Sequence, residues 1–140
     1  MSNATLISGT KLVLLTEHAA VSADVNGTGV DMLGAKQAVM LFKLGTTTGT
    51  SATVRVLLQE SSDNSSFSTI GTSATVALDA GAGTGATFAV QAATHTKRYI
   101  RYAIDVAGTS PVCGDVLVCI LTSGHAYSRE TSDYTVTLTA

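Results

Sequence analysis

The sequence predicts an all-β domain, an antiparallel β-sandwich of the jelly-roll type with about ten short strands and extended terminal arms. Hydrophobic residues alternate with polar ones in several short runs, and turn-forming residues separate these runs at intervals of about ten residues. Thr, which is β-branched and suits an extended backbone, occurs 22 times. A chain of 140 residues is also the size of one domain with one core.

Two runs show clear alternation with a period of two residues, which is typical of a half-buried strand. In residues 53–59 the apolar face carries Val54, Val56 and Leu58. In residues 99–106 the inward positions are Ile100, Tyr102, Ile104 and Val106. Both runs are therefore expected to contribute one face to the core.

Residues 112–121 are apolar on both faces apart from Gly114 and Asp115, so we expect a central strand covered on two sides. Cys113 and Cys119 lie six residues apart in this run. A regular strand would place them on the same face about 20 Å apart, too far for a disulfide. We interpret both as small buried hydrophobic residues rather than as metal ligands or redox groups.

Weaker patterns predict the remaining strands, and Asn26-Gly27 predicts a hairpin between the second and third of them. These strands are residues 11–15, 20–25, 29–33, 38–44, 67–70, 74–78, 86–91 and 135–139. Turns are expected at residues 45–51, 60–66, 79–85 and 107–111. The expected organisation is an N-terminal arm over 1–10, the sandwich over 11–122, and a C-terminal arm with the last strand over 123–140.

No residues form a recognisable catalytic, cofactor-binding or metal site. The three histidines have no spaced ligand partners, and the glycine-rich residues 81–85 precede an expected strand rather than a helix that could hold an anion. Glu60, Asp63 and Asn64 lack the ordered spacing of a calcium loop and are expected to form a solvated turn. We therefore predict that the protein is not an enzyme.

A small basic group is the best candidate for contact with a partner. On a strand, Lys97, Tyr99 and Arg101 share the outward face and give a basic edge with one aromatic ring, although an ordinary solvated face is favoured because three charges rarely form a specific site alone. In the C-terminal stretch, Tyr127, Arg129 and Tyr134 are further candidate interface residues.

Composition limits the classes of partner. A net charge of −2 with scattered basic residues argues against nucleic acid, and no run approaches the 20 or so apolar residues that span a bilayer. The apolar run after Lys11 is too short for a signal peptide, so we expect synthesis in the cytoplasm. Charged residues make up only 13%, and a hydroxyl-rich surface can be covered by a protein partner at low desolvation cost.

The chain resembles the head decoration or cement proteins of tailed bacteriophages. The resemblance lies in residues 56–63 (VLLQESSD), which lead into FSTI at 67–70, and in residues 97–102 (KRYIRY), which lead into GTSP at 108–111. It implies a jelly roll on the outer surface of the virion, bound to a major capsid protein of the HK97-type fold, with self-association as a dimer. It implies no catalytic residues and no cofactor.

Two other classes stay open at this point. A carbohydrate- or receptor-binding β-sandwich of a phage tail or adhesin is disfavoured because sugar sites use aromatic platforms, and this chain has no Trp and four Tyr. A small β-fold enzyme of the cupin type would need a cluster of His and carboxylate ligands that the sequence does not show.

Overall fold

The computed structural model describes residues 11–32, 35, 37–92 and 97–123. The expected arms, the expected strand at 135–139, and the residues His95, His125, Tyr127, Arg129 and Tyr134 therefore lie outside the described residues.

Within the described residues the fold is all-β, as predicted, with one turn of 3-10 helix, η1 (Asp79–Gly81). The strands are β1 (Lys11–Val21), β2 (Val25–Asn26), β3 (Val30–Asp31), β4 (Gln37–Lys43), β5 (Thr47–Ser61), β6 (Ser68–Thr72), β7 (Val76–Ala77), β8 (Thr87–Ala92) and β9 (Tyr99–Ser123). Two of these strands, β5 and β9, are much longer than the short strands that the sequence predicted.

The strands form four long lengths of chain that lie side by side. The first length is β1 to β3, the second β4 and β5, the third β6 to β8, and the fourth β9. β9 lies between the first and second lengths and pairs antiparallel with both of them from end to end. The third length pairs antiparallel with the other edge of the second.

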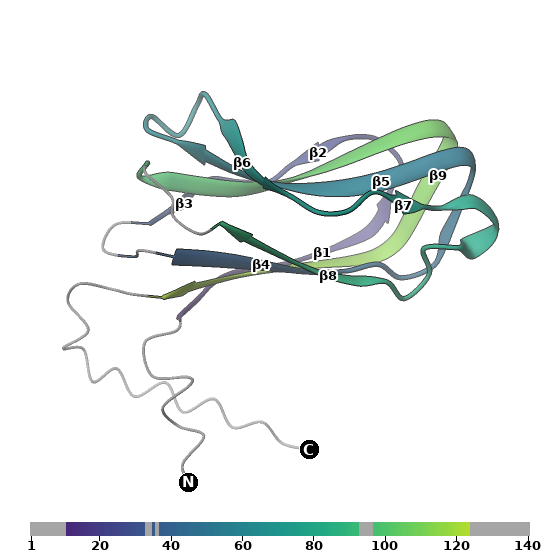
Figure 1. Ribbon diagram of the computed structural model, residues 1–140, viewed down its shortest axis with the longest axis horizontal. Coiled ribbons are helices and arrows are strands. Elements are labelled where there is room, and N and C mark those ends of the chain that lie inside the picture. The colour runs from purple at the N-terminus through teal and green to yellow at the C-terminus, as the bar shows by residue number, and fades with distance from the viewer. Residues whose placement is uncertain (1–10, 33–34, 36, 93–96, 124–140) are drawn as a thin grey trace, which may run out of the picture.

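All four lengths bend at the same end of the molecule, so the sheet folds over into two facing layers (Figure 1). Layer A holds β1, the C-terminal half of β9, β4 and β8. Layer B holds β2 with β3, the N-terminal half of β9, β5, and β6 with β7. Two four-stranded layers joined in this order form a jelly roll, which confirms the predicted fold class.

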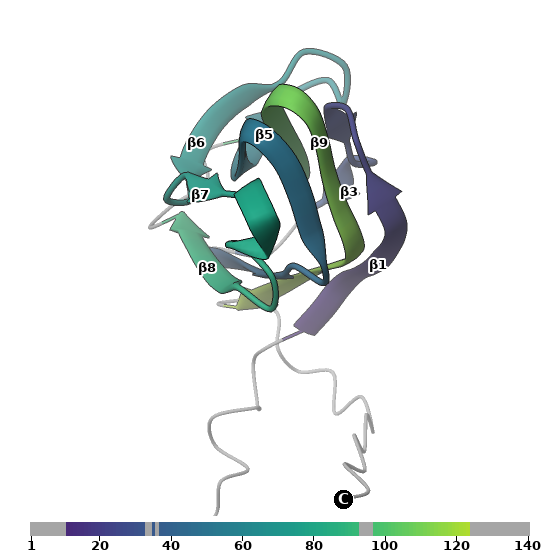
Figure 2. The same cartoon turned by 90° about the vertical axis from the view of Figure 1, so that its right-hand side faces the viewer.

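The bent end, which we call the crease, explains three of the predicted turns. Residues 45–51, 79–85 and 107–111 were expected to reverse the chain, but they lie side by side at the crease (Figure 2), and the first and last continue within β5 and β9. Left-handed backbone gathers in and beside these segments, at Ser51, Ala80, Gly81, Gly85, Gly108, Ser110 and Asp115. The turn chemistry was correctly recognised, but it bends each length of chain instead of reversing it.

The predicted hairpin at Asn26-Gly27 is wrong. β2 and β3 both pair with β9 in the same direction, Val25 opposite Ile104 and Val30 opposite Ile100. The backbone N–H of Gly27 donates to the Tyr102 carbonyl at 2.9 Å, so the segment between the two strands stays against β9. The expected turn at 60–66 does reverse the chain, between β5 and β6, although Glu60 itself is buried at the end of β5.

The core lies between the layers and is built from the alternating positions that the sequence indicated. Layer B contributes Val54, Val56, Leu58, Ile100, Tyr102 and Ile104, and layer A contributes Met40, Phe42, Val90, Val116, Val118 and Ile120. Each fully buried side chain of this size contributes about 1.5–3 kcal/mol to folding. Aliphatic packing therefore supplies most of the stability.

The prediction that the two cysteines lie on the same face of the strand is wrong. Cys113 is fully buried, whereas Cys119 is half-buried on the outer side of β9. Gly114 and left-handed Asp115 both lie between the inward residues Cys113 and Val116, and this extra residue shifts the alternation by one position. Both thiols are free.

Candidate protein-protein interface

The outer face of layer A carries a row of apolar side chains that crosses all four strands. The strand register places Leu15 opposite Cys119, Cys119 opposite Leu41, and Leu41 opposite Ala89. Leu15 and Leu41 are 62% and 41% exposed, and Leu117, two residues from Cys119 on the same face, is 38% exposed. We call this surface, defined by Leu15, Leu41, Leu117 and Cys119, the apolar face.

A shallow groove of about 550 Å³ runs over the apolar face. Its lining residues are Leu15, Leu41, Phe42, Lys43, Thr87, Phe88, Ala89, Leu117 and Cys119. Burial within this groove raises the pKa of the Cys119 thiol above its ordinary value, so the thiol is held in its neutral form. Leu12, 51% exposed, extends the apolar surface along β1.

This groove corrects the prediction for residues 112–121. The run is central, because β1 and β4 flank it within the layer, but its outer side is not covered by any of the described residues. An apolar run indicates that both faces of the strand are covered. It does not tell whether the second face is covered by the same chain or by another. The apolar face was therefore missed as a site, although the signal was present in the sequence.

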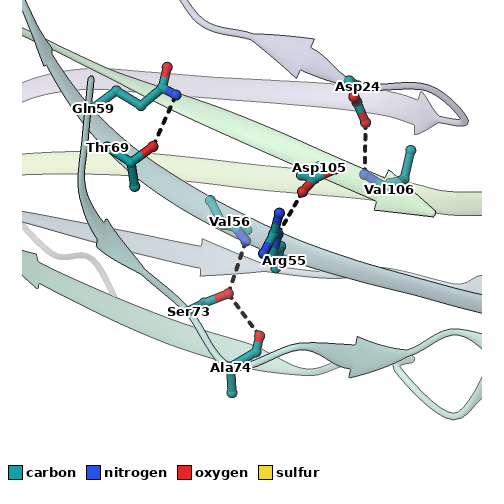
Figure 3. Close-up of polar contacts among 9 residues, drawn as sticks. All are labelled: Asp24, Arg55, Val56, Gln59, Thr69, Ser73, Ala74, Asp105 and Val106. Carbon is teal, nitrogen blue, oxygen red and sulfur yellow. Dashed lines mark hydrogen bonds and ion pairs between the residues drawn. The ribbon is translucent and has the colours of Figure 1, made fainter. Parts of the chain in front are cut away.

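The outer face of layer B has the opposite character, because polar side chains bridge its strands (Figure 3). Arg55 of β5 forms an ion pair with Asp105 of β9 at 2.5 Å, and Gln59 donates to the Thr69 hydroxyl at 3.3 Å. At the crease, the Asp24 carboxylate accepts from the backbone N–H of Val106 at 2.9 Å. The sandwich thus has one polar outer face and one apolar outer face.

The predicted basic edge lies on the layer B side, where its charges contact neighbours in the same chain. The Lys97 ammonium donates to the Ser68 hydroxyl at 3.1 Å, and the Arg101 guanidinium donates to Gln59 at 2.8 Å. The Arg101 guanidinium also lies 4.1 Å from the centre of the Phe67 ring. These contacts hold β9 to β5 and β6, and the role of the edge in binding a partner stays a prediction.

Beside this edge, Arg98 has two contacts of its own. It pairs with Asp31 of β3 at 2.7 Å, and its guanidinium lies 5.3 Å from the centre of the Tyr99 ring. The hydrogen bond to the Asp31 carboxylate and its negative charge raise the pKa of Arg98 above its ordinary value.

The residues considered as chemical sites have structural roles. Asp63 accepts hydrogen bonds from the backbone N–H groups of Ser65 and Ser66 and from the Ser61 hydroxyl, and these lower the pKa of its carboxyl to about 2. In the glycine-rich segment, the Gly83 N–H donates to the buried Thr47 hydroxyl at 3.1 Å, and β8 follows as expected. Across the described ranges no three His, Cys, Asp or Glu residues lie close enough to bind a metal ion.

The described part of the chain contains no helix with the length and apolar character needed to cross a bilayer. The described residues do form three distinct surfaces, which are one apolar sheet face, one polar sheet face and a basic edge.

The class of protein that these features define is a small antiparallel jelly roll with one exposed apolar sheet face. The chain belongs to the Bbp16 family, whose family model matches residues 4–120. Among curated proteins, none matches this chain.

Solved structures with related folds include the PBSX exported protein XepA, with a TM-score of 0.55 and 19% identity over 89% of this chain and 39% of that chain. This chain thus spans less than half the length of XepA, and the likeness shows a shared fold. A protein of Bacillus endospore appendages, described as disulfide-linked pili, has a TM-score of 0.49 and 12% identity over 81% of this chain and 86% of that chain. The SPBc2 prophage-derived protein YomS has a TM-score of 0.41 and 12% identity, over 78% of this chain and 92% of that chain.

Proposed function

We propose that this protein is a virion structural protein that binds the outer surface of a phage capsid and cements neighbouring major capsid subunits together. The partner is a major capsid protein of the HK97-type fold, and the finer resemblance is to the cement protein of the short-tailed Bordetella phage. The protein would be made in the host cytoplasm and act on the virion surface, with self-association as a homodimer. Membership of the Bbp16 family is consistent with this proposal.

The observation that carries the proposal is the contrast between the two outer faces. Leu15, Leu41 and Leu117 expose apolar area on one side of the sandwich, while the other side is bridged by ion pairs and hydrogen bonds. A contiguous exposed apolar patch rimmed by polar residues is typical of a protein-binding surface. In this proposal the apolar face rests on the shell and the polar face meets solvent.

The size of the apolar face suggests how cementing would work. Four strands about 4.8 Å apart, each contributing at most three residues at 3.4 Å, give a patch of roughly 200 Å². This is smaller than the roughly 800 Å² per partner that a stable protein complex buries. One contact would be weak, and repetition around a symmetric shell would supply the strength.

Cosedimentation with phage heads that lack this protein tests the proposal. Wild-type protein is expected to bind in a fixed ratio to the major capsid protein, and Leu15→Ser with Leu41→Ser is expected to reduce bound copies at least about tenfold, because one or two weak contacts are lost at every repeat. Leu57→Ser is the matched control, because Leu57 is the corresponding leucine on the outer side of layer B. Failure of the wild-type protein to bind, or equal losses in both variants, would contradict the proposal.

A further inference from the structure

The outer edge of β1 is the longest free strand edge among the described residues. β1 pairs with β9 on one side and with no described strand on the other, and Figure 2 shows it at the margin of the molecule. The other edge strands are shorter, since β8 has six residues, β6 has five, and β2, β3 and β7 have two each. An unpaired edge presents a row of backbone N–H and C=O groups with which another strand can pair.

β1 lacks most of the features by which proteins protect an edge strand from pairing. Its register with β9 is continuous from Leu14 to His18, after a single irregularity between Leu12 and Leu14. Residues 14–21 contain no proline and one charged side chain, that of Glu17. Charges, prolines, bulges and short strands are the usual protections. The stretch from Leu14 to His18 is therefore a regular edge that is available for pairing.

The most exposed large hydrophobic side chains of the described chain lie on this edge strand. Leu12 and Leu15 are both more than half exposed, whereas Leu41 and Leu117, on the interior strands β4 and β9, are less exposed. Apolar exposure therefore increases toward the free edge of layer A. A strand placed beside β1 would cover Leu12 and Leu15 directly, because directly opposite side chains of neighbouring strands are in contact.

The pattern of this edge makes a second copy of the same strand a suitable partner. Antiparallel pairing about a two-fold axis keeps the outer face of layer A on the same side in both copies, so the two apolar faces join. With the axis at Leu15, the two Leu15 side chains would be opposite each other, and the two Glu17 residues would be four residues apart, about 14 Å. An axis at Glu17 would place like charges opposite each other, and an axis at Thr16 would place each Leu15 opposite a Glu17. The axis at Leu15 is therefore the favoured register.

We infer that two copies associate by antiparallel pairing of their β1 edges, with Leu15 at the two-fold axis. The inference rests on the self-association included in the proposed function and assigns the surface that forms it. The two copies of layer A would join into one eight-stranded sheet, and two patches of roughly 200 Å² would become one apolar surface of roughly 400 Å². The dimer would thus bring twice the apolar area of one copy to the shell, because its own interface lies at the edge and leaves Leu41 and Leu117 uncovered.

Analytical ultracentrifugation of the purified full chain tests this inference. Wild-type protein is expected to dimerise with a dissociation constant in the micromolar range, because the interface is small. Leu15→Lys is expected to raise this constant about tenfold or more, because two like charges would be opposite each other at the axis. Leu41→Lys is the matched control and is expected to dimerise like wild type, because it makes the same change on the same face but on the interior strand β4. Urea denaturation checks that both variants are folded.

A charge-pairing experiment tests the register. Leu15→Lys and Leu15→Glu are each expected to be monomeric at concentrations where wild type is dimeric. Their mixture is expected to form a heterodimer, because opposite charges would then be opposite each other at the axis.

Wild-type protein that is monomeric at every concentration would overturn the inference, and so would Leu15→Lys protein that dimerises as well as wild type. Equal losses in Leu15→Lys and Leu41→Lys would also overturn it, because the apolar faces would then stack on each other. A mixture of the two Leu15 variants that stays monomeric would contradict the axis at Leu15. A dimer with the expected pattern that fails to bind phage heads would refute the cementing function and leave the edge pairing intact, whereas a monomer that binds heads would refute the edge pairing alone.

Discussion

His18 and Tyr102 join the two layers by a hydrogen bond, with the His18 Nε2 and the Tyr102 hydroxyl oxygen 2.8 Å apart. His18 belongs to β1 in layer A and Tyr102 to β9 in layer B, and their rings meet edge to face with centres 5.9 Å apart. Burial raises the pKa of Tyr102, so its hydroxyl stays neutral and can donate or accept. This contact is a polar link across a core that is built mainly from aliphatic side chains.

Tyr102→Phe should lower the free energy of unfolding by about 1 kcal/mol, because it removes the hydroxyl and leaves His18 without this partner. Tyr99→Phe is the control, since Tyr99 lies on the outer side of β9 and the change should have little effect. Urea denaturation of both variants measures the difference. An unchanged midpoint for Tyr102→Phe would show that water replaces the hydroxyl at no cost.

Gly108→Ala should destabilise the crease more than Gly85→Ala, although both glycines have left-handed backbone, with φ of 98° and 75°. A Cβ at Gly108 would collide with the backbone of Ser51 and Ala52, whereas one at Gly85 meets nothing within 4 Å. We expect a loss of about 1 kcal/mol for Gly85→Ala and about 3 kcal/mol or more for Gly108→Ala. Thermal and chemical unfolding of the two variants measures these losses, and equal losses would argue against close packing at the crease.

The Asp63 turn should make the folded state sensitive to acid. Hydrogen bonds lower the pKa of this carboxyl from its ordinary 3.8 to about 2, so the ionised form is favoured in the folded state. Its contribution to stability is therefore present above pH 3.8 and lost as the pH falls through about 2. A carboxyl titration followed by NMR should give this low midpoint, and a midpoint near 3.8 would mean that the turn does not hold Asp63.

Substitutions on the apolar face should leave the fold intact. Leu15→Ser with Leu41→Ser is expected to change the free energy of unfolding by less than about 1 kcal/mol, because both side chains lie at the surface, 62% and 41% exposed. Leu58→Ala in the core should cost about 2–5 kcal/mol by comparison. Chemical denaturation checks both values, and a large loss on the apolar face would show that those leucines support the sheet.

The sequence predicted the fold class and most of the inward-facing residues, because alternation directly reports which face of a strand is buried. In residues 53–59 and 99–106 the alternate positions predicted to be apolar and inward, from Val54 to Leu58 and from Ile100 to Val106, are buried or packed against the core as expected. Residues 107–111 were misinterpreted as a reversal, since the residue types that permit left-handed backbone are needed by a tight turn and by a bend within a strand alike. Only pairing with β5, distant in sequence, decides between the two.

The candidate site was less predictable. The basic edge at Lys97 and Arg101 stood out in the sequence because charge is scarce, yet these side chains contact Ser68, Gln59 and Phe67 of the same chain. The apolar face is assembled from β1, β4, β8 and β9, and no single stretch of sequence contains it. Sheet register brings Leu15 and Leu41 to either side of Cys119, and register is a long-range property.

The central position of β9 also has a consequence for how the molecule is made. β9 is the last described strand of the chain, yet it is the one that fills the gap between β1 and β4 and between β3 and β5. A nascent chain on the ribosome cannot close layer B until about residue 107 has emerged, or layer A until residue 123 has emerged, and pairing across almost the whole chain length makes the final step slow. Strands such as β1 therefore lack their pairing strand until β9 has emerged, and their apolar side chains stay exposed. Chaperones would be most needed during that interval.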